Sequence, residues 1–270
     1  MKNKISIVVV LFIIHSNCFA GADNLPIGAK QAGMGNAAVA TSDIWSIYHN
    51  QAGLAGLEKT TASIYATQGY MLKQMNQGAV AFAYPTKYGV FAASFNSCGF
   101  KLYNENKTGL AFARKFGDAL RIGAQANLNS ISLGDIYGKK STLTFEAGVQ
   151  SKLTKKLWLG AHVYNISRSS VTSIEKVPVI VRFGLNYSFN TNVQVNIEYE
   201  KNWTIKPLYK AGLEYRIVPE FALRAGINGG SSKTTFIGAA YKLKLLSIDA
   251  ACSFDSRLGT SPHLGLTYLF

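Results

Sequence analysis

Apolar and polar residues alternate with a period of two through most of this chain, and turn residues interrupt the alternation at regular spacing. In the span 192–201, for example, Val195 and Ile197 alternate with Asn196 and Glu198. This period is typical of a β-strand with one apolar and one polar face. The pattern predicts about fourteen strands, at approximately 61–68, 78–85, 88–97, 107–116, 119–130, 142–152, 156–166, 178–189, 192–201, 207–217, 219–228, 233–243, 245–254 and 262–270.

The connections between these predicted strands alternate in length. Tight turns are expected at 85–87, 116–118, 153–155, 190–191, 218–220 and 243–244. Longer polar or glycine-rich loops are expected at 69–77, 98–106, 132–141, 167–177, 202–206, 229–232 and 255–261. Short turns at one end and longer loops at the other, with an even number of strands, are typical of bacterial outer-membrane barrels.

The first 20 residues have the composition of a secretory signal peptide. Lys2 and Lys4 precede an apolar run at 5–14, and a small-x-small cleavage site follows at 18–20, which would leave Gly21 as the mature N-terminus. The apolar run is too short to cross a bilayer as a helix, which takes roughly 20 residues. The chain is therefore expected to be exported.

No later run has the length of a transmembrane helix, so a membrane protein built from this chain has to be a barrel. Parity alone does not exclude a soluble barrel with apolar residues inside. The export signal, the two classes of connection and the C-terminal strand favour the transmembrane form. That strand ends with Leu264, Leu266, Tyr268 and Phe270 on one face, and Tyr268 and Phe270 resemble the signal that the barrel assembly machinery recognises.

Composition and charge agree with a membrane setting. Charged residues make up 16% of the chain, below the roughly 25% of soluble domains. The formal charge is +14, and it drops by two when Lys2 and Lys4 are removed. The remaining basic residues are dispersed and form no basic helix, so we expect contact with anionic outer-membrane lipid and no nucleic-acid partner.

One long segment, 28–57, is neither signal peptide nor alternating strand. Its elements 33–40, 43–48 and 50–55 resemble the N-terminal hatch of the FadL-like superfamily of outer-membrane barrels, and particularly its PorV/PorQ branch. Gln51 stands where that family generally has proline, and Asn36 stands at a customary glycine. The resemblance implies a fourteen-stranded transmembrane β-barrel in the cell outer membrane, with a helical hatch inside its lumen.

The predicted organisation is therefore a signal peptide at 1–20, a hatch segment at 21–57 and a barrel at 58–270. Within the hatch, Ser42 is expected to cap a helix over 43–49, and Gly53 is expected to adopt a positive φ. A fourteen-stranded barrel encloses a space that needs partial filling, and the hatch is the natural filler. The candidates for ligand contact are Gly33, Gly35, Trp45, Tyr48, Asn50 and Gly53.

Several charged residues occupy the polar face of the predicted strands and would line the lumen. They either border a permeation path or pair across adjacent strands, and pairing is the simpler interpretation. These residues are Arg121, Glu146, Arg182, Glu198, Lys210, Glu214, Arg216 and Arg224.

Other chemistry finds little support. The spacing of Gly33, Gly35 and Ala38 superficially matches a dinucleotide fingerprint but lacks the strand before it. The histidines have no metal-ligand spacing, and His162 has no spacing that supports a serine–histidine hydrolase. We expect no enzyme activity, no metal and no cofactor. Parity places Cys98 on the lumen face and Cys252 on the lipid face, which disfavours a disulfide between them.

Two functions remain open at this stage. The first is a FadL-like channel, in which a small hydrophobic solute passes or binds at the hatch and leaves sideways through the wall. The second is a PorV/PorQ-like component that engages secreted proteins in type IX secretion. The hatch segment supports both.

Overall fold

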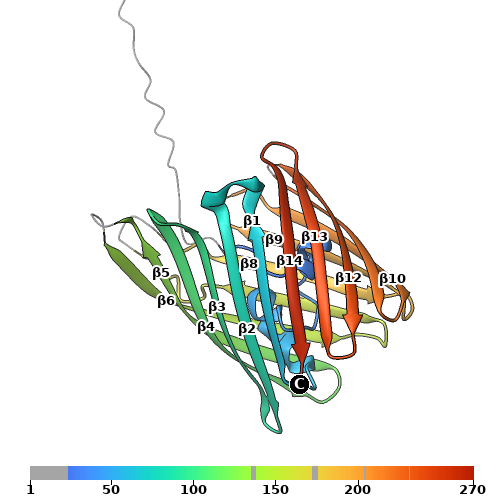
Figure 1. Ribbon diagram of the computed structural model, residues 1–270. Helices are drawn as coiled ribbons and strands as arrows, with labels where there is room; N and C mark the ends of the chain where they lie inside the picture. The colour runs from blue at the N-terminus through green and yellow to red at the C-terminus, as the bar shows by residue number, and fades with distance from the viewer. Residues whose placement is uncertain (1–23, 135–137, 172–175, 204, 231) are drawn as a thin grey trace, which may run out of the picture.

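The structure is a computed structural model that describes residues 24–134, 138–171, 176–203, 205–230 and 232–270. The predicted signal peptide lies outside the described residues. The strands form one closed antiparallel barrel in which each pairs with its neighbours in the chain and β14 pairs back with β1 (Figure 1). Closure gives each strand a neighbour on both sides, as a barrel in lipid requires. Along the described chain, β6 pairs with β7 only over 147–152, so the part of β6 nearest the loop end pairs with β5 alone.

The described chain contains the fourteen predicted strands, close to their expected positions. They are β1 (Thr61–Gln68), β2 (Asn76–Thr86), β3 (Gly89–Phe100), β4 (Tyr103–Phe116), β5 (Leu120–Ser132), β6 (Lys139–Lys152), β7 (Leu157–Tyr164), β8 (Ile180–Ser188), β9 (Val193–Asn202), β10 (Leu208–Val218), β11 (Phe221–Gly229), β12 (Lys233–Leu243), β13 (Leu246–Asp255) and β14 (Gly259–Leu269). The prediction of a fourteen-stranded antiparallel transmembrane barrel is confirmed.

The predicted difference between the two ends of the barrel is only partly right. At the turn end, which also carries the C-terminus, the connections are as tight as expected. At the opposite end, here called the loop end, the connection predicted over 98–106 is a two-residue hairpin between β3 and β4, closed by the pair Phe100 and Tyr103. Gly99 has a φ of +119° there, which lets the strands continue into the tight hairpin. The connections 230–232 and 256–258 are short as well.

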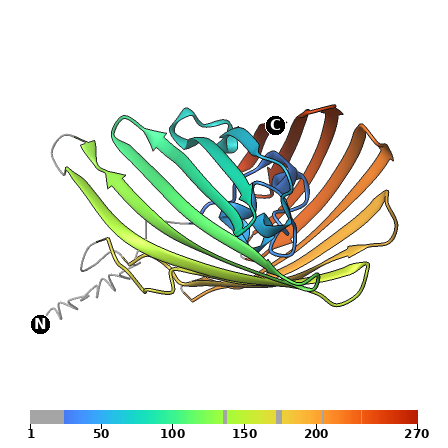
Figure 2. The same cartoon turned by 90° about the horizontal axis from the view of Figure 1, so that it is seen from below.

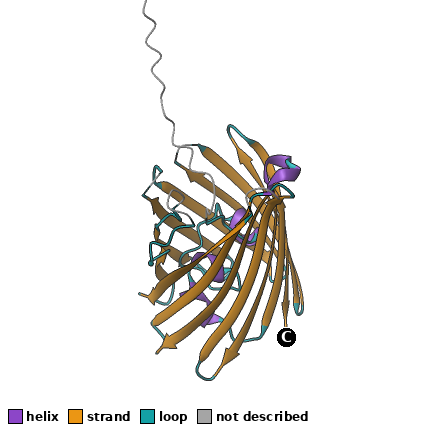
Figure 3. Cartoon of the chain, turned by 90° about the vertical axis from the view of Figure 1, so that its left-hand side faces the viewer, coloured by secondary structure: helices purple, strands orange, loops and turns teal. Residues whose placement is uncertain are grey.

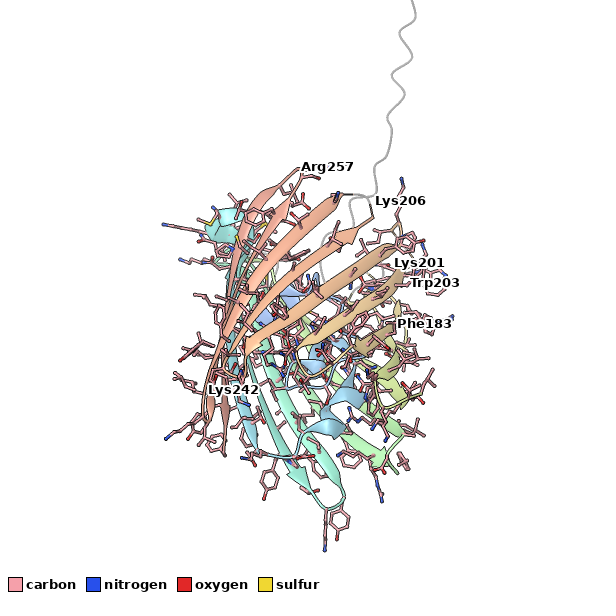
Figure 4. The ribbon with its side chains drawn as sticks, turned by 90° about the vertical axis from the view of Figure 1, so that its right-hand side faces the viewer. Phe183, Lys201, Trp203, Lys206, Lys242 and Arg257 are labelled. Atoms are coloured by element: carbon pink, nitrogen blue, oxygen red, sulfur yellow. The ribbon has the colours of Figure 1, made fainter. Side chains whose placement is uncertain are left out.

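The outer face of the barrel is apolar. On β4, the side chains of Leu110 and Phe112 point outward and are exposed. Lys107, at an inward-facing position of the same strand, is buried in the lumen. The rims carry basic residues: in Figure 4, Lys206 and Arg257 lie at the loop end and Lys242 lies toward the turn end. An apolar band between polar rims is the surface that a transmembrane barrel presents to lipid.

The hatch, described from residue 24 to residue 57, lies inside the barrel. Figure 2 shows it enclosed by the ring of strands, and Figure 3 shows its short helices within the wall. It contains α1 (Ala29–Gly33), α2 (Ser46–His49) and the 3-10 helix η1 (Gln51–Gly56), and nearly all of its residues from 27 to 55 are buried. Two further 3-10 turns, η2 (Gly69–Met71) and η3 (Lys73–Met75), lie at the loop end. None of the helices in the described ranges is long and apolar enough to cross a membrane.

Two local predictions for the hatch were wrong. The helix begins at Ser46 rather than Asp43, and Ser42 does not cap it, because its hydroxyl donates to the carbonyl of Gly53 instead. Gly53 does not have a positive φ, since it lies within η1. A side chain there would meet the Thr41 carbonyl at 2.4 Å, so the position requires glycine for space rather than for backbone conformation.

Candidate functional site

Inward-facing glycines of the wall form a seat for the hatch backbone. A Cβ atom on Gly212 would lie 2.3 Å from the carbonyl oxygen of Met34, and one on Gly226 would lie 2.1 Å from the amide nitrogen of Gly35. Gly160 approaches the Val39 carbonyl in the same way. Only glycine permits such contact between two backbones, so this side of the hatch rests directly on the wall from β5 to β12.

Polar side chains of the wall hold the same part of the hatch. One carboxylate oxygen of Glu198 on β9 accepts hydrogen bonds from the amides of Ala38 and Val39, at 2.7 and 2.8 Å. The side-chain amide of Gln150 on β6 donates to the Thr41 carbonyl at 2.6 Å, and that of Asn196 donates to the Ala37 carbonyl at 2.7 Å. Buried backbone groups of the hatch are thereby satisfied by the barrel rather than by regular structure.

Within the hatch, Asn50 and Gln51 complete these connections. The Asn50 side chain accepts from the Ala52 amide and donates to the Val39 carbonyl at 2.7 Å, so it closes the turn. Gln51, which replaces the proline customary in the resembled family, donates to Glu146 on β6 at 2.9 Å. The departure from the family pattern therefore adds a polar connection between hatch and wall.

The charged side chains of the lumen form ion pairs. Glu146 pairs with Lys107 at 2.7 Å and contacts His162 at 3.0 Å. An Arg182 nitrogen lies 3.4 Å from Nδ1 of His162. Because a guanidinium only donates, Nδ1 accepts and Nε2 carries the proton that His162 donates to Glu146. The His162 ring is therefore neutral, and it connects the Glu146 carboxylate to the Arg182 guanidinium.

The same network continues across β8, β9 and β10. Arg182 pairs with Glu200 at 2.6 Å, and Lys210 lies between Glu200 and Glu198 at 2.7 and 2.9 Å. Each buried charge thus has an opposite charge beside it, which offsets the cost of removing it from water. The network ends on Glu198, the carboxylate that holds the hatch amides.

A second group of ion pairs lies nearer the turn end. Arg224 on β11 pairs with Glu214 at 2.8 Å and with Asp249 at 2.6 Å. Arg216 also pairs with Glu214, but its side chain is 44% exposed at the rim. In the hatch, Lys30 pairs with Asp43 at 3.2 Å.

The opposite side of the hatch packs without comparable polar contacts. Its apolar residues Ile44, Trp45, Ile47, Tyr48 and Leu54 form one cluster with small inward-facing residues of β2, β3 and β4. The wall residues of this cluster are Ala79, Ala81, Ala83, Val90, Ala92, Ala111 and Ala113, with Tyr65 from β1. The lumen therefore has a polar half that holds the hatch through many hydrogen bonds and a half along β2 to β4 where apolar packing predominates. Nearer the loop end, Lys107 of β4 also donates a hydrogen bond to Asn24 of the hatch at 3.2 Å.

Two aromatic side chains of the hatch lie between two cavities. On the turn-end side, a cavity of about 420 Å³ is lined by Trp45 together with Ile44, Leu57 and the charged residues around Arg224. On the loop-end side, a cavity of about 30 Å³ is lined by Tyr48. The ring centroids of Trp45 and Tyr48 are 6.1 Å apart, so one ring from the lining of each cavity lies beside the other. This adjacent pair is called the partition below.

His49 lies in the hatch rather than in a membrane-spanning strand, and it is fully enclosed. Its Nε2 lies 2.9 Å from the carbonyl oxygen of Ile27. Burial, together with the positive charge of Arg182, lowers the pKa of His49 to about 4. The ring is therefore neutral at pH 7 and donates to Ile27.

The predicted hatch candidates divide into two groups. Trp45 and Tyr48 line cavities, as a ligand-contacting residue would. Gly33 and Gly35 instead contact the wall at β11 and neighbouring strands. Asn50 and Gly53 make contacts within the hatch, Asn50 with the Val39 carbonyl and Gly53 with the Thr41 carbonyl. The contacts of these four residues are therefore structural, and none of the four lines either cavity.

Seven of the eight predicted lumen charges lie inside the barrel wall, and Arg216 is the one that points to the rim. Arg121 lies toward the turn end, where its guanidinium stacks over the Trp158 ring at 4.0 Å. Sequence reasoning missed Lys107 and Asp249, although both share the inward parity of their strands. The sequence pattern placed the inward-facing wall glycines on the polar face of their strands, but it did not predict that the hatch backbone packs against them.

Other candidate chemistry has no geometric basis in the described chain. No group of three or more metal-ligating side chains occurs among the residues that the structure describes. Cys98 and Cys252 are both free thiols, as parity suggested. Tyr268 and Phe270 contact each other edge to face, with centroids 4.8 Å apart, and their role as an assembly signal stays a prediction.

No protein-family model and no curated protein sequence matches this chain. Solved structures do resemble it. The toluene transporter TbuX of Ralstonia pickettii superposes with a TM-score of 0.74 at 13% identity, covering 90% of this chain and 98% of the transporter. A Pseudomonas aeruginosa FadL homologue gives 0.68 at 14% identity, covering 91% and 99%. The toluene transporter TodX of P. putida gives 0.70 at 12% identity, covering 90% and 98%.

Sequence identities this low support a statement about the fold alone. The matches extend over nearly the full length of each neighbour. None of these neighbours is a PorV or PorQ protein, so that branch stays a prediction. The chain has the fold of the FadL-like outer-membrane β-barrels.

Proposed function

We propose that this protein is an outer-membrane channel through which a small hydrophobic solute passes along the apolar side of the hatch. The observation that carries the proposal is the Trp45–Tyr48 partition between a cavity on the loop-end side and a larger cavity on the turn-end side. A solute that displaces these two rings would connect the cavities without disturbing the polar half of the lumen.

The asymmetry of the hatch contacts favours this route. In the described part of the chain, the apolar hatch residues meet the alanines of β2 to β4 by packing alone. Moving them away exposes apolar surface, at a cost of about 1.5–3 kcal/mol for one large side chain. An apolar solute in the seam would recover part of that free energy. Moving the other side would break the hydrogen bonds from Glu198 and Gln150 as well as buried ion-pair contacts.

The wall beside the apolar seam is closed, which bears on the expected sideways exit. Pairing between β1 and β2 runs without interruption from Thr61–Ala83 to Gln68–Asn76, and pairing between β2 and β3 is equally continuous. A sideways exit there would require these backbone hydrogen bonds to open. We therefore propose that the solute leaves through the turn-end cavity, which lies inside the lumen.

The structural neighbours support the class of solute. TbuX and TodX are described as toluene transporters, and the neighbour CymD is described as a monoaromatic hydrocarbon channel. These are channels and not enzymes, in keeping with a transport role. Nothing in the described contacts favours the type IX secretion alternative, so we do not carry it further.

Permeation of liposomes tests the proposal. The protein is reconstituted, and uptake of toluene is compared with uptake of glucose. We expect selective uptake of toluene and a rise of several-fold in the double variant Trp45→Ala, Tyr48→Ala, because both rings of the partition are removed. Trp203→Ala is the matched control, since Trp203 is 68% exposed at the loop end, where Figure 4 shows it. Uptake no greater than in protein-free liposomes, in both the native protein and the double variant, would refute the channel.

A further inference from the structure

Buried polar atoms without a hydrogen-bond partner gather in one corner of the lumen. Of the buried side-chain atoms that lack a partner within the described chain, most lie between the hatch and the strands β2 to β5. They are Nδ2 of Asn24, Oη of Tyr48, Nε2 of Gln77, Oγ of Ser94, Oδ1 of Asn96 and Oε1 of Gln125. An unpaired buried polar atom is costly, so a cluster of them indicates a place built to bind something polar.

Strand register brings the wall members of this cluster together. Ser94 and Asn96 follow each other on the inner face of β3, and Asn96 lies directly opposite Ala79 on β2 and Lys107 on β4. The small alanine leaves room beside the Asn96 side chain. The hatch contributes Tyr48, which is 2% exposed. The Tyr48 hydroxyl lies close to that of Ser94 without meeting hydrogen-bond geometry.

Three of the residues that carry these atoms line the cavity of about 30 Å³ on the loop-end side of the hatch, namely Asn24, Tyr48 and Asn96. On the same measure one water molecule needs about 10–15 Å³, so the cavity has room for a small polar group but not for a whole solute with a ring. Leu25 and Ile131 form the apolar part of the same lining. The cavity thus offers polar contacts for one end of a molecule and apolar contacts for the part attached to it.

The two charged side chains that line the cavity, Lys107 and Glu105, both have hydrogen-bond partners. Lys107 is paired with Glu146 at 2.7 Å, and Glu105 accepts a hydrogen bond from the Tyr103 hydroxyl. A further anion would lie near two carboxylates, and a further cation would lie near the Lys107 ammonium. A neutral group avoids both and carries no cost of burying a charge.

The unpaired atoms also define which neutral group fits. Asn96 offers an acceptor, Asn24 offers a donor, and the Tyr48 hydroxyl can do either. A hydroxyl group satisfies this set, because it donates one hydrogen bond and accepts others.

We infer that this cavity binds the hydroxyl of a neutral amphipathic solute, with Tyr48 and Asn96 as its hydrogen-bonding partners, so that the channel prefers alcohols to hydrocarbons or carboxylates of the same shape. The inference rests on the proposed channel and names the class of its solute. Tyr48 then has two roles, because its ring belongs to the partition and its hydroxyl forms a hydrogen bond with the hydroxyl of the solute.

The test uses three solutes built on one ring: toluene, benzyl alcohol and benzoate. Their binding to the native protein, to Tyr48→Phe and to Asn96→Ala is measured by calorimetry in detergent, and toluene uptake is measured in liposomes. We expect benzyl alcohol to bind the native protein more tightly than benzoate. Tyr48→Phe should weaken benzyl alcohol binding roughly tenfold, the effect of about one hydrogen bond, and should change benzyl alcohol binding much more than toluene binding.

A matched control separates recognition from folding. The Tyr65 hydroxyl is bonded to His263 at 2.8 Å, so Tyr65→Phe should lower the melting temperature without changing the preference for alcohol. Tyr48→Phe removes an unpaired hydroxyl and should leave the melting temperature unchanged or raise it.

Two results would overturn the inference while leaving the channel intact. One is benzyl alcohol binding that is the same in the native protein, Tyr48→Phe and Asn96→Ala while toluene uptake persists. The other is tighter binding of benzoate than of benzyl alcohol. Absence of binding by all three solutes, together with absence of toluene uptake, would refute both the inference and the channel.

Discussion

Replacing Glu198 by glutamine should loosen the hatch while leaving the barrel closed. One carboxylate oxygen of Glu198 accepts the amides of Ala38 and Val39, and the other accepts Lys210 at 2.9 Å. The amide of glutamine has a single oxygen, so Glu198→Gln cannot serve both sides. One of the two sets of donors would face an NH₂ group.

The magnitude follows from these contacts. A hydrogen bond to a charged group contributes about 1.5–3 kcal/mol, and a neutral one contributes about 1 kcal/mol. Converting the two hatch bonds from charged to neutral therefore costs about 2 kcal/mol. The weakened contact of Lys210 costs about a further 1 kcal/mol of barrel stability, but it lies within the wall and is the same whether the hatch is open or closed. Lys210 keeps Glu200 at 2.7 Å, which limits the second loss. Local opening of the hatch should become easier by about 2 kcal/mol, or roughly thirtyfold.

Hydrogen exchange of the amides at 38 and 39 measures this directly, because amides exchange through local opening. We expect them to exchange roughly thirtyfold faster in Glu198→Gln, with the strand amides changed much less. Glu220→Gln is the control, since Glu220 is exposed at the turn between β10 and β11. Exchange at 38 and 39 within twofold of the native rate, in a variant whose barrel is folded by gel migration and circular dichroism, would show that Glu198 does not hold the hatch.

Three further predictions concern the seat, the hatch turn and pH. Gly226→Ala places a Cβ atom 2.1 Å from a hatch amide and should destabilise the protein by about 1–3 kcal/mol in denaturant titration, whereas Gly229→Ala, with no atom within 4 Å of the added carbon, should change much less. Gln51→Pro loses a hydrogen bond to the wall but restricts the unfolded chain, so the two effects should cancel to within about 1 kcal/mol; a larger loss would mean that the glutamine is essential to the turn. Because the pKa of His49 is lowered from 6.5 to about 4, its contribution to hatch stability is present above pH 6.5 and is lost as the pH falls toward 4. Exchange of the hatch amides should accelerate across that interval beyond the intrinsic pH effect, and a His49→Gln variant should not show this acceleration.

The pattern of side chains along the sequence determined the wall of this protein. Alternation is a local property, so the number of strands, their inward and outward faces and most of their limits could be read from neighbouring residues. The free thiols Cys98 and Cys252 followed from the same parity. The glycines and alanines of the segment 28–57 also indicated close backbone contact with the barrel wall, although not which wall residues it would meet.

Contacts between distant residues decided the rest. The carboxylate that holds Ala38 is 160 residues away in the chain, and barrel closure brings the two together. Strand register, which depends on all fourteen strands at once, selected which lumen charges pair and set Asn96 beside Lys107. The hatch took its short helix and its turn at Gly53 from the space left by the wall, so its predicted cap and φ were wrong while its burial was right. The alternation of neighbouring residues determines the strands of the barrel wall. The conformation of the hatch depends on contacts with strands that are distant in the sequence, and alternation carries no information about those contacts.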